Sequence, residues 1–497
     1  MIVGGGISGL SAAYDLHRAG VECTVFEKSP RLGGVIETRC WQDCVLDCGP
    51  DSFISAKPEA LALIRELGLE SDVIGSNDHQ RTTYILKNGR LIALPEGIMM
   101  IAPTKVIPMV LTPLLSWGTK LGMARELLRR PRTYPDRSVA EFVIDHFGKE
   151  TLEYLAEPLL SGIYGGDPRE LSVNSVLPRF VEMEQRVGSL SRAVIKSRPK
   201  STDPRPDGRG LKSEAGPRPD GPVSKNTRSV TVNTRSLTVA PQDGRGLKQE
   251  PSLFRTLKRG LGGMVEALSK DLHVEHGKVE AIVRTRENRY RLRASGHEIG
   301  ADHVILAGPA WSAAELVRGI DGELSGLLDG IPYSSSAIVS LIYDAAGFDG
   351  MRAGFGFLVP KRERKRLAAC TFVNTKFPFR APENRIVLRC FFGGVEDGGA
   401  LAESDESLVG MAREELRRIL GLNAAPVYHT IARWPRSMAQ YVVGHGDRVR
   451  EIQDRAAAIP GLHLAGNGYE GIGIPDCIRT GRRAAKSIIA GLGDRLQ

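Results

Sequence analysis

Apolar positions near the start of the chain follow first a strand-like and then a helical spacing. Ile2 and Val3 form a short apolar run before a glycine-rich turn, and residues 10–19 carry apolar side chains at helical intervals. Residues 21–26 form a second apolar run that ends at Glu27. This order of strand, turn, helix and strand predicts the first half of a parallel β-α-β unit.

The apolar pattern near the C-terminus resembles the one near the N-terminus, and the pattern in the central part differs from both. Near the C-terminus a short buried strand is predicted at residues 462–465, followed by a helix from about Pro475 to Ala490. In the centre, helical spacing gives way to the alternation typical of an antiparallel sheet. The helical segments are residues 139–147 and 150–160, and the alternating ones are residues 331–343, 354–359, 370–372 and 386–392.

The segment from Val181 to Leu253 lacks this patterning. It contains no aromatic residue, and the sequence of residues 207–212 recurs at residues 243–248. Such a segment cannot bury enough apolar surface to offset the entropy of ordering it. We therefore expect residues 197–250 to be a disordered insertion.

Residues 98–118 are the most apolar stretch, with Lys105 as their only charge. Pro103, Pro108 and Pro113 interrupt them, and each proline removes a backbone donor that lipid could not replace, so a single membrane span is not expected. Basic residues follow at 120–132. The region fits contact with a membrane surface, the mouth of an apolar channel or a buried helical layer, and the sequence leaves these alternatives open.

The composition is that of a soluble globular protein with two or more domains, since 41% of its 497 residues are hydrophobic and 25% are charged. The formal net charge is +9, but twelve basic and six acidic residues lie between Lys196 and Glu250. Most of the charge therefore belongs to the expected insertion. Because no basic groove with interleaved aromatic residues appears, nucleic-acid binding is not predicted.

The seven cysteines are an odd number in a long chain, which favours a reducing compartment over a disulfide framework. Cys40, Cys44 and Cys48 are spaced four apart, which matches no common zinc pattern. We expect them to be partly buried thiols on a hairpin and predict no metal site. His273 and His276 are expected on the surface of a strand.

Residues 4–9 read Gly-Gly-Gly-Ile-Ser-Gly, a G-x-G-x-x-G turn between a predicted strand and helix. Gly4 permits the turn, Gly6 lets the backbone approach a diphosphate, and Gly9 lets the helix pack on the strand. The free N–H groups at the helix N-terminus would face that diphosphate. Glu27 can accept hydrogen bonds from a ribose 2′-hydroxyl, which favours an adenosine without a 2′-phosphate.

A second motif, Glu27-x-x-x-Arg31-x-Gly33-Gly34, follows at once. It resembles the second fingerprint of the superfamily of FAD-binding amine oxidases, phytoene desaturases and protoporphyrinogen oxidases. This resemblance changes the expected cofactor from NAD to FAD.

Four further motifs narrow the resemblance: Gly49 to Phe53, Leu160 to Asp167, Trp434 to Tyr441 and Gly471 to Cys477. With the first two motifs they are similar to the oxygen-dependent protoporphyrinogen/coproporphyrinogen oxidases of haem biosynthesis. The similarity is greatest to the bacterial branch that forms coproporphyrin III. It covers nearly the whole chain apart from the insertion.

The resemblance implies which residues contact FAD and substrate. The FAD contacts carried over by motif are Gly4, Gly5, Gly6, Ile7, Ser8, Gly9, Glu27, Lys28, Arg31, Gly33, Gly34, Val35, Gly49, Pro50, Asp51, Ser52, Val279, Trp434, Ile472, Gly473 and Ile474. The implied substrate contacts are Asp51, Gly162, Tyr164 and Phe391. Lys361, Arg362, Lys376 and Arg389 are cationic candidates for the carboxylates of a substrate. No general base is expected, because hydride transfer to a flavin leaves the chemistry to the cofactor.

The resemblance also implies an α/β fold in three parts. Residues 1–80, 255–310 and 425–497 would form a Rossmann-like FAD-binding domain of the GR2 type. Residues 311–424, with 81–95, would form an α+β substrate domain on an antiparallel sheet. Residues 96–195 would form a helical subdomain that lines the active-site cavity and contacts a membrane.

The implied reaction is the six-electron oxidation of coproporphyrinogen III to coproporphyrin III, with O₂ as acceptor and H₂O₂ as product. The alternatives are a protoporphyrinogen IX oxidase, an amine oxidase or carotenoid desaturase, and a non-catalytic FAD-fold binding protein. For an amine oxidase, only Trp434 and Tyr469 are candidates for an aromatic cage. The first residues lack the features of a secretory signal. We expect a cytoplasmic protein, either free or on the inner face of the cell membrane, and the sequence leaves its oligomeric state open.

Overall fold

The glycine-rich turn extends from a five-stranded parallel sheet with the strand order β12-β2-β1-β16-β22. The strands are β1 (Ile2–Val3), β2 (Thr24–Glu27), β12 (His273–His276), β16 (Val304–Leu306) and β22 (Leu462–Leu464). Strands β2 and β16 are buried throughout, as expected for a parallel sheet with both faces covered. Three distant parts of the sequence thus build one sheet, and the predicted α/β fold with a Rossmann-like domain is confirmed.

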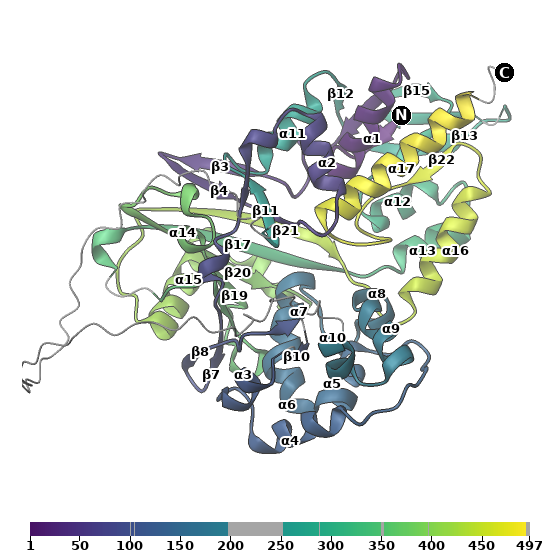
Figure 1. Ribbon diagram of the computed structural model, residues 1–497. Coiled ribbons are helices and arrows are strands. Elements are labelled where there is room, and N and C mark those ends of the chain that lie inside the picture. Colours follow the sequence, from purple (N-terminus) through teal and green to yellow (C-terminus); the bar gives the residue numbers. More distant parts are fainter. Residues whose placement is uncertain are drawn as a thin grey trace, which may run out of the picture. The chain divides into compact units, whose positions relative to one another are not determined.

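Helices α1 (Ile7–Arg18) and α17 (Ile474–Gly493) lie side by side against this sheet (Figure 1). Their contact is close, because a Cβ added at Gly481 of α17 would lie 2.0 Å from the carbonyl oxygen of Ser8. This packing brings the N-terminus of each helix to the same end of the sheet. Helices α2 (Glu59–Glu66) and α11 (Gly262–Ser269) pack against α17 and α1 respectively.

A seven-stranded sheet has the order β21-β17-β20-β19-β18-β7-β8. Its strands are β7 (Thr83–Lys87), β8 (Arg90–Ala93), β17 (Tyr333–Asp344), β18 (Gly356–Leu358), β19 (Ala369–Phe372), β20 (Arg385–Gly393) and β21 (Tyr428–Ala439). The sheet was expected to be antiparallel, but it is mixed, because β18 pairs with β7 in parallel. The hairpin of β7 and β8 comes from a distant segment of the chain. Because no tight turn joins β7 to β18, these two strands can pair in parallel.

Strand β21 belongs to residues 425–497, which we expected in the FAD-binding domain, yet it forms an edge of this mixed sheet beside β17. Residues 1–196 and 251–497 form one compact unit. The domain boundaries given above therefore stay predictions.

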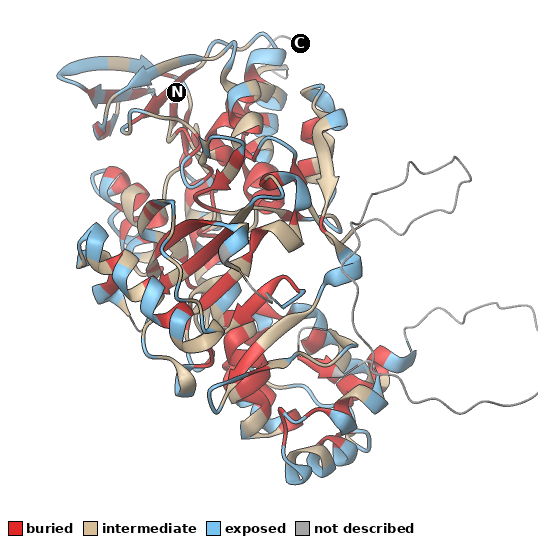
Figure 2. Cartoon of the chain, turned by 90° about the vertical axis from the view of Figure 1, so that its left-hand side faces the viewer, coloured by how far each residue is buried: buried red, intermediate tan, exposed pale blue. Residues whose placement is uncertain are grey.

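The structure, a computed structural model, describes residues 1–99, 101–103, 105–196, 252–287, 289–348, 352–395 and 397–493. The expected insertion at residues 197–250 lies outside the described residues. Figure 2 shows buried residues along the central strands and exposed residues on the outer faces of the helices.

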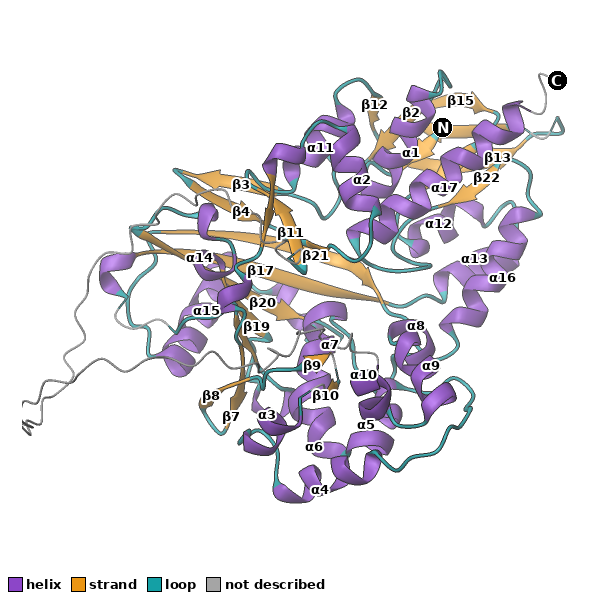
Figure 3. Cartoon of the chain, viewed as in Figure 1, coloured by secondary structure: helices purple, strands orange, loops and turns teal. Residues whose placement is uncertain are grey.

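Helices dominate residues 106–196 (Figure 3). They are α3 (Val106–Leu111), α4 (Trp117–Glu126), α5 (Val139–Phe147), α6 (Lys149–Thr151), α7 (Glu157–Tyr164), α8 (Val173–Val176), α9 (Pro178–Val187) and α10 (Leu190–Lys196). Between α6 and α7 the chain forms a π-helix at Leu152–Ala156, where we expected a continuous α-helix. In the described part of the chain, no helix is long and apolar enough to cross a membrane.

The remaining strands and helices lie outside the two sheets and the helical segment described above. The other strands are β3 (Thr38–Trp41), β4 (Cys44–Asp47), β5 (Phe53–Ile54), β6 (Val73–Gly75), β9 (Ile98–Met99), β10 (Ala102–Pro103), β11 (Phe254–Leu257), β13 (Val279–Arg284), β14 (Tyr290–Ala294) and β15 (His297–Ala301). The other helices are α12 (Ala310–Val317), α13 (Gly322–Asp329), α14 (Val373–Lys376), α15 (Asp405–Leu420) and α16 (His445–Ala457).

Candidate functional site

The glycine-rich turn leaves space at one position and is tightly packed at the others. Gly4 has φ of 112°, and a Cβ added at Gly9 would lie 2.0 Å from the carbonyl oxygen of Gly4. A Cβ added at Gly6, in contrast, meets no atom within 4 Å. The residues therefore fit a diphosphate, which needs close backbone approach at this middle glycine.

The N-terminus of α1 keeps its backbone donors available for a ligand. Its N-cap residue is Gly6, which offers no capping side chain, and its first turn contains no acidic residue. The unpaired N–H groups and the positive end of the helix dipole therefore favour an anion in front of the turn.

Glu27 lies beside this turn and is almost fully buried. Its carboxylate accepts hydrogen bonds from the backbone N–H groups of Gly5 and Ser29, both at 2.8 Å. Each carboxylate oxygen keeps a further lone pair that a ribose hydroxyl can use. The Gly277 N–H donates to the Glu27 carbonyl oxygen at 2.9 Å, which brings Val279, two residues later, to the same corner.

The second motif packs directly on the first. The Gly33 N–H donates to the Gly5 carbonyl oxygen at 2.8 Å, and a Cβ added at Gly34 would lie 3.3 Å from the Gly6 Cα. The Arg31 guanidinium shapes the loop by donating to the Gly34 carbonyl oxygen at 2.6 Å. Two motifs recognised separately in the sequence thus form one surface.

Trp434 joins this surface from the mixed sheet. Its Nε1–H donates to the Cys48 carbonyl oxygen at 2.8 Å, and the Arg31 guanidinium lies 5.3 Å from the centre of its ring. A Cβ added at Gly49 would lie 1.8 Å from the Val35 carbonyl oxygen, so this loop needs glycine. Residues expected at the flavin end of FAD are therefore in contact with one another.

The strand register decides which side chains of the mixed sheet accompany Trp434. Trp434 pairs with Ser336, which pairs with Gly393, and Phe391 and Arg389 lie two and four residues before Gly393 on β20. Because side chains two residues apart point to the same face of a strand, Trp434, Phe391 and Arg389 share one face.

Asp51 connects the loop of residues 49–52 to this face. Its carboxylate accepts hydrogen bonds from Lys376 Nζ at 2.8 and 2.9 Å, from Arg389 Nη1 at 2.9 Å and from Ser52 Oγ at 2.7 Å. Burial alone would raise the pKa of Asp51, but the two cations and the hydrogen bonds outweigh burial and lower it well below its usual range. Lys376 and Arg389 are thus already paired with a carboxylate.

The substrate candidates on α7 lie over the same face of the mixed sheet. A Cβ added at Gly162 would lie 3.3 Å from Leu358, which is aligned with Phe391 across β19. The Tyr164 carbonyl oxygen accepts a hydrogen bond from Gln440 Nε2 at 2.7 Å. Burial raises the pKa of the Tyr164 phenol to about 12, so this hydroxyl stays protonated at neutral pH.

A small pocket opens beside α7, on the motif of residues 160–167. It is lined by Glu157, Ser161, Gly165, Gly166, Asp167, Pro168, Arg364, Gly393, Gly394 and Val395. Lys361 and Arg362 lie nearby, since Lys361 Nζ is 3.9 Å from Asp167 and Arg362 Nη1 is 2.7 Å from Glu153. These two cations are separate from the pair that Asp51 holds.

The predicted segment at residues 472–474 leads into α17 as expected. A Cβ added at Gly471 would lie 2.3 Å from the Asp476 Cγ, so this position needs glycine. Asp476, in the first turn, is held by Lys57 Nζ at 2.6 Å. Tyr469, weighed above for an aromatic cage, is buried.

The cysteines and histidines lie as expected from their spacing. Cys40 and Cys44 lie on the hairpin of β3 and β4 and Cys48 directly after it, the first exposed and the others buried. His273 and His276 are exposed on β12.

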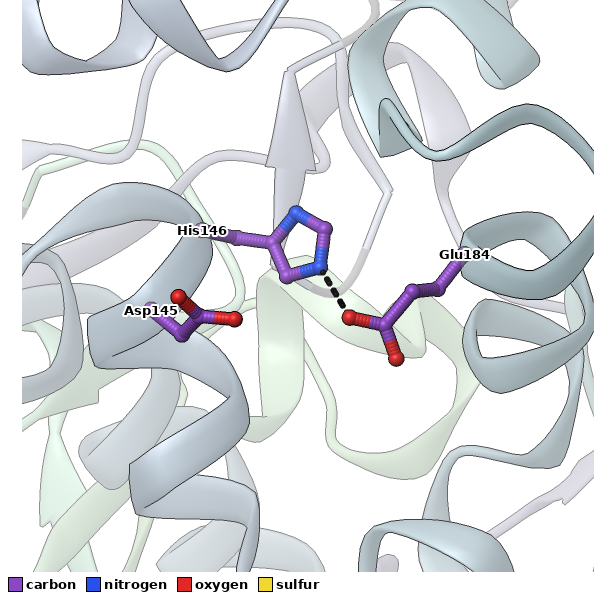
Figure 4. Close-up of side chains that lie close together, drawn as sticks. All are labelled: Asp145, His146 and Glu184. Atoms are coloured by element: carbon purple, nitrogen blue, oxygen red, sulfur yellow. Dashed lines mark hydrogen bonds and ion pairs between the residues drawn. The ribbon is translucent and has the colours of Figure 1, made fainter. Parts of the chain in front are cut away.

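Figure 4 shows the one group in the described residues whose geometry could hold a metal ion: Asp145, His146 and Glu184. His146 Nε2 lies 2.9 Å from Glu184, and Nδ1 lies 3.1 Å from Glu126 of α4. Carboxylates only accept hydrogen bonds, so both contacts form when the ring carries two protons. Burial alone would lower the pKa of His146, but the hydrogen bonds to Glu126 and Glu184 raise it above its ordinary value.

An arginine already occupies the position that a metal would need. Arg137 Nη1 lies 3.2 Å from Asp145, and its Nη2 lies 2.6 Å from Glu184. Because a doubly protonated imidazole offers no lone pair and Arg137 neutralises the carboxylates, we interpret this group as an ion-pair network that joins helices.

The sequence analysis missed three residues next to the expected cofactor site: Lys57, Trp311 and Arg436. Trp311 follows the short apolar run of residues 304–307, and ligands bind at the carboxyl ends of buried strands, so a signal for it was present. Lys57 has no local signal, because its role depends on a contact with a distant segment. Arg436 lies in the motif from Trp434 to Tyr441, but nothing in that motif distinguishes its side chain from a surface arginine.

Comparisons with known proteins agree with this arrangement. The model of the family described as flavin containing amine oxidoreductase matches residues 7–489. The chain is 32% identical to coproporphyrinogen III oxidase of Bacillus subtilis over 503 residues, which cover 98% of this chain and 97% of the relative. It is 27% identical to chloroplastic protoporphyrinogen oxidase 1 of Arabidopsis thaliana, over 96% of this chain and 85% of the relative.

Solved structures extend the comparison. A protein assigned as a protoporphyrinogen oxidase from Exiguobacterium sp. 255-15 superposes with a TM-score of 0.81 at 29% identity, over 99% of this chain and 98% of that one. A putrescine oxidase superposes with a TM-score of 0.66 at 16% identity, over 99% of this chain and 98% of that one. The second likeness shows a shared fold.

Proposed function

The chain belongs to the flavin-containing amine oxidoreductase family, and on that premise we propose that it oxidises coproporphyrinogen III to coproporphyrin III. As an FAD-dependent oxidoreductase of the porphyrinogen oxidase group, it would use O₂ as electron acceptor and release H₂O₂. The observation that carries the proposal is a match over almost the full length of coproporphyrinogen III oxidases, with both FAD motifs complete and in contact.

The site supports this reaction without a catalytic acid or base from the protein. When bound, FAD supplies the redox chemistry by accepting hydride from the substrate and passing electrons to O₂. The proposed task of the chain is to bind and orient. Residues 4–9 would hold the diphosphate and Glu27 the ribose, while Trp434 and Arg31 would lie beside the ring system.

The shared face of the mixed sheet supports a large, mostly apolar macrocyclic substrate. Phe391 lies next to Arg389, whose guanidinium is 5.2 Å from the centre of the Phe391 ring, and Asp51 neutralises that charge. A porphyrinogen macrocycle can pack on such a surface while its carboxylates reach the rim. Gly162 and Tyr164 would cover the opposite side of the macrocycle from α7.

The choice between two porphyrinogens rests on the relatives. Coproporphyrinogen III carries four propionates and protoporphyrinogen IX two, so the former needs more cationic or donor groups around it. Lys376 and Arg389 are paired with Asp51, while Lys361 is paired with Asp167 and Arg362 with Glu153. All four cations therefore stay candidates for propionates, and each would have to share its charge with a carboxylate of the protein. Oxidation of protoporphyrinogen IX is the second candidate function, favoured by the 27% identity to the Arabidopsis protein.

An amine oxidase is less well supported. Its aromatic cage would need Trp434 and Tyr469, but Tyr469 is buried and the Trp434 indole is bound to the Cys48 carbonyl oxygen. A non-catalytic role is also less well supported, because the loop at Gly49 and Trp434, expected beside the flavin ring, are in place as well as the diphosphate motif.

We further propose a cytoplasmic protein that touches a membrane surface through α3 and α4. Ile107, Leu111, Trp117 and Leu121 are large apolar side chains exposed on these helices, with Lys120 among them. Apolar side chains flanked by basic ones favour an anionic lipid surface. Sedimentation with anionic vesicles should carry the wild-type chain down and leave the double variant Leu111→Ser and Trp117→Ser in solution.

The cofactor assignment is tested at Gly6, where an added side chain meets no protein atom but would occupy the place of the diphosphate. Gly6→Val should fold normally and be purified without FAD, whereas Gly300→Val, also in open space but on β15, should keep the flavin. The flavin absorbance per protein decides, and equal flavin in both variants would refute the assignment.

The substrate assignment is tested by turnover under air. We expect a higher kcat/KM for coproporphyrinogen III than for protoporphyrinogen IX, followed by porphyrin fluorescence and peroxide release. The reverse order would favour the second candidate function, and absence of turnover with either substrate would refute both.

A further inference from the structure

Two cations from distant parts of the chain converge on one indole ring. Lys28 directly follows β2, and its Nζ lies 5.5 Å from the centre of the Trp311 ring. Arg436, from β21 of the mixed sheet, places its guanidinium 4.6 Å from the centre of the same ring. The Trp311 Nε1–H donates to the Arg436 carbonyl oxygen at 3.2 Å, which fixes the indole to that backbone.

This cluster of Lys28, Trp311 and Arg436 lies at the edge of the sheet from which the glycine-rich turn extends. Strands β2 and β16 flank β1 on either side, so Lys28 and Trp311 follow the carboxyl ends of its two neighbours. A Cβ added at Gly4 would lie 3.0 Å from the Gly308 nitrogen, three residues before Trp311. The cluster therefore spans the turn of residues 4–9, where a dinucleotide binds in this type of sheet.

The two cations lack a counter-charge among the described residues. In the described part of the chain, neither Lys28 nor Arg436 forms an ion pair with a carboxylate, whereas Arg31 nearby is paired with Glu37 at 3.4 Å. Both side chains are also exposed. Like charges held close together repel each other, and an anion bound between them would attract both.

The backbone at Arg436 is strained, and other contacts hold it in place. Arg436 has φ of 43°, in the left-handed region that side chains other than glycine rarely adopt. It belongs to a bulge in which residues 435–437 stand opposite Ser335 alone. Ser335 Oγ accepts a hydrogen bond from the Arg436 N–H at 2.9 Å, and Asn467 Nδ2 donates to the Ser437 carbonyl oxygen at 2.8 Å. Strain held in this way is typical of positions that serve a ligand.

We propose that Lys28, Trp311 and Arg436 form a cationic clip over the adenosine diphosphate half of FAD. Arg436 and Lys28 bind the negative charge of the diphosphate from the side opposite the α1 N-terminus, and the Trp311 ring keeps the two cations close together. The mixed sheet, which carries the proposed substrate face, thereby contributes a residue to cofactor retention. The inference rests on FAD as the cofactor and is independent of which substrate is oxidised.

The test uses Arg436→Gly and Arg436→Lys in the full chain. Glycine accepts the positive φ and removes the charge, while lysine keeps the charge. The dissociation constant of FAD for the apo-protein is measured by quenching of flavin fluorescence, and the thermal unfolding of each apo-protein is recorded. We expect Arg436→Gly to raise the dissociation constant of FAD about tenfold to a hundredfold, as for one lost charge-assisted contact. Its apo-protein should unfold close to the wild-type temperature, and Arg436→Lys should retain most of the affinity.

Two further measurements separate the clip from a general structural effect. Lys28→Gln should also weaken the binding of FAD. When salt is raised, both charge-removing variants should lose less FAD affinity than wild type, because fewer cations face the diphosphate. ADP, which carries only the diphosphate half, should show the same ranking of variants. Riboflavin, which carries the flavin ring but no phosphate, should bind all variants alike.

An unchanged FAD dissociation constant in Arg436→Gly would overturn the clip, as would an equal loss of riboflavin affinity. None of these measurements needs a porphyrinogen. A chain that binds FAD through the clip but oxidises neither porphyrinogen would therefore refute the proposed function and leave this inference standing.

Discussion

Two clusters of buried charge, one around Asp51 and one around His146, use different kinds of cation. Asp51 is held by Lys376 and Arg389, which carry their charge at every physiological pH. Glu126 and Glu184 are held by His146, whose charge depends on its pKa. An acid held between two cations thus gives a pH-insensitive anchor, and a histidine held between two acids gives a pH-dependent one.

The two clusters also join different parts of the molecule. The Asp51 cluster links the loop of residues 49–52 to β20 and to the end of α14, beside the expected flavin. The His146 cluster links α4, α5 and α9, and Glu126 also accepts the N–H groups at the start of α10. A cluster of buried charges therefore indicates helix packing in one place and a candidate site in the other. Which of the two a cluster indicates depends on the residues that pair with each charged group.

The largest effect is expected at Asp51. Asp51→Asn leaves Lys376 and the buried Arg389 facing each other without a counter-charge, which should lower the free energy of unfolding by about 3 kcal/mol or more. Urea unfolding of both proteins measures the loss. The double variant Asp51→Asn and Lys376→Met removes the repulsion and should recover part of it. A loss below about 1 kcal/mol in the single variant would contradict a buried, coupled cluster.

A smaller loss is expected at His146. In His146→Gln, Glu126 keeps its hydrogen bonds from Ser189 and Leu190, and Glu184 keeps Arg137, so neither acid is left alone. We expect a loss of about 2 kcal/mol in the free energy of unfolding, as for hydrogen bonds to a charged group. The matched control His273→Gln, at an exposed histidine on β12, should stay within about 0.5 kcal/mol of wild type.

The pH dependence of stability should separate the clusters. The pKa of His146 is raised in the folded state, so its contribution is complete below the ordinary value of about 6.5 and is lost as pH rises through the folded pKa. The pKa of Asp51 is lowered, so its contribution is complete above about 3.9 and is lost only in acid. Stability above pH 6.5 should therefore fall in wild type and be flatter in His146→Gln. Equal slopes in the two proteins would contradict the assignment.

The smallest effect is expected from metal ions. Because Arg137 lies between Asp145 and Glu184 and both nitrogens of His146 contact carboxylates, Zn²⁺ should not raise the melting temperature. Melting curves with Zn²⁺ and with a chelator test this, with Arg137→Gln as the comparison. A metal-dependent rise in wild type would show that Figure 4 depicts a metal site.

Elements defined by local pattern were predicted correctly. The strand, turn and helix of β1 and α1, the strand β22 and the helix α17 follow from apolar spacing, glycine and proline positions within a few residues. Local steric and hydrophobic preferences suffice for such elements. The π-helix at Leu152–Ala156 was missed, because its sequence reads as an ordinary helix.

Pairing between distant segments could not be read from the sequence. The parallel pairing of β18 with β7 and the place of β21 in the mixed sheet depend on which edge of the sheet each segment reaches. The pairing of Lys376 and Arg389 with Asp51 joins residues more than 300 positions apart, and no periodicity records it.

By itself, the sequence indicated the cofactor site: Gly4, Gly9 and Gly33 satisfy backbone sterics that other residue types do not, and Glu27 supplies a carboxylate beside the turn. The tertiary structure decided which cations are neutralised and which stay free. Lys376 and Arg389 looked like substrate ligands and are paired, whereas Lys28 and Arg436 lie together without a carboxylate partner in the described residues. The physical reason is that charge pairing depends on distance in space, which the fold sets and the sequence order does not.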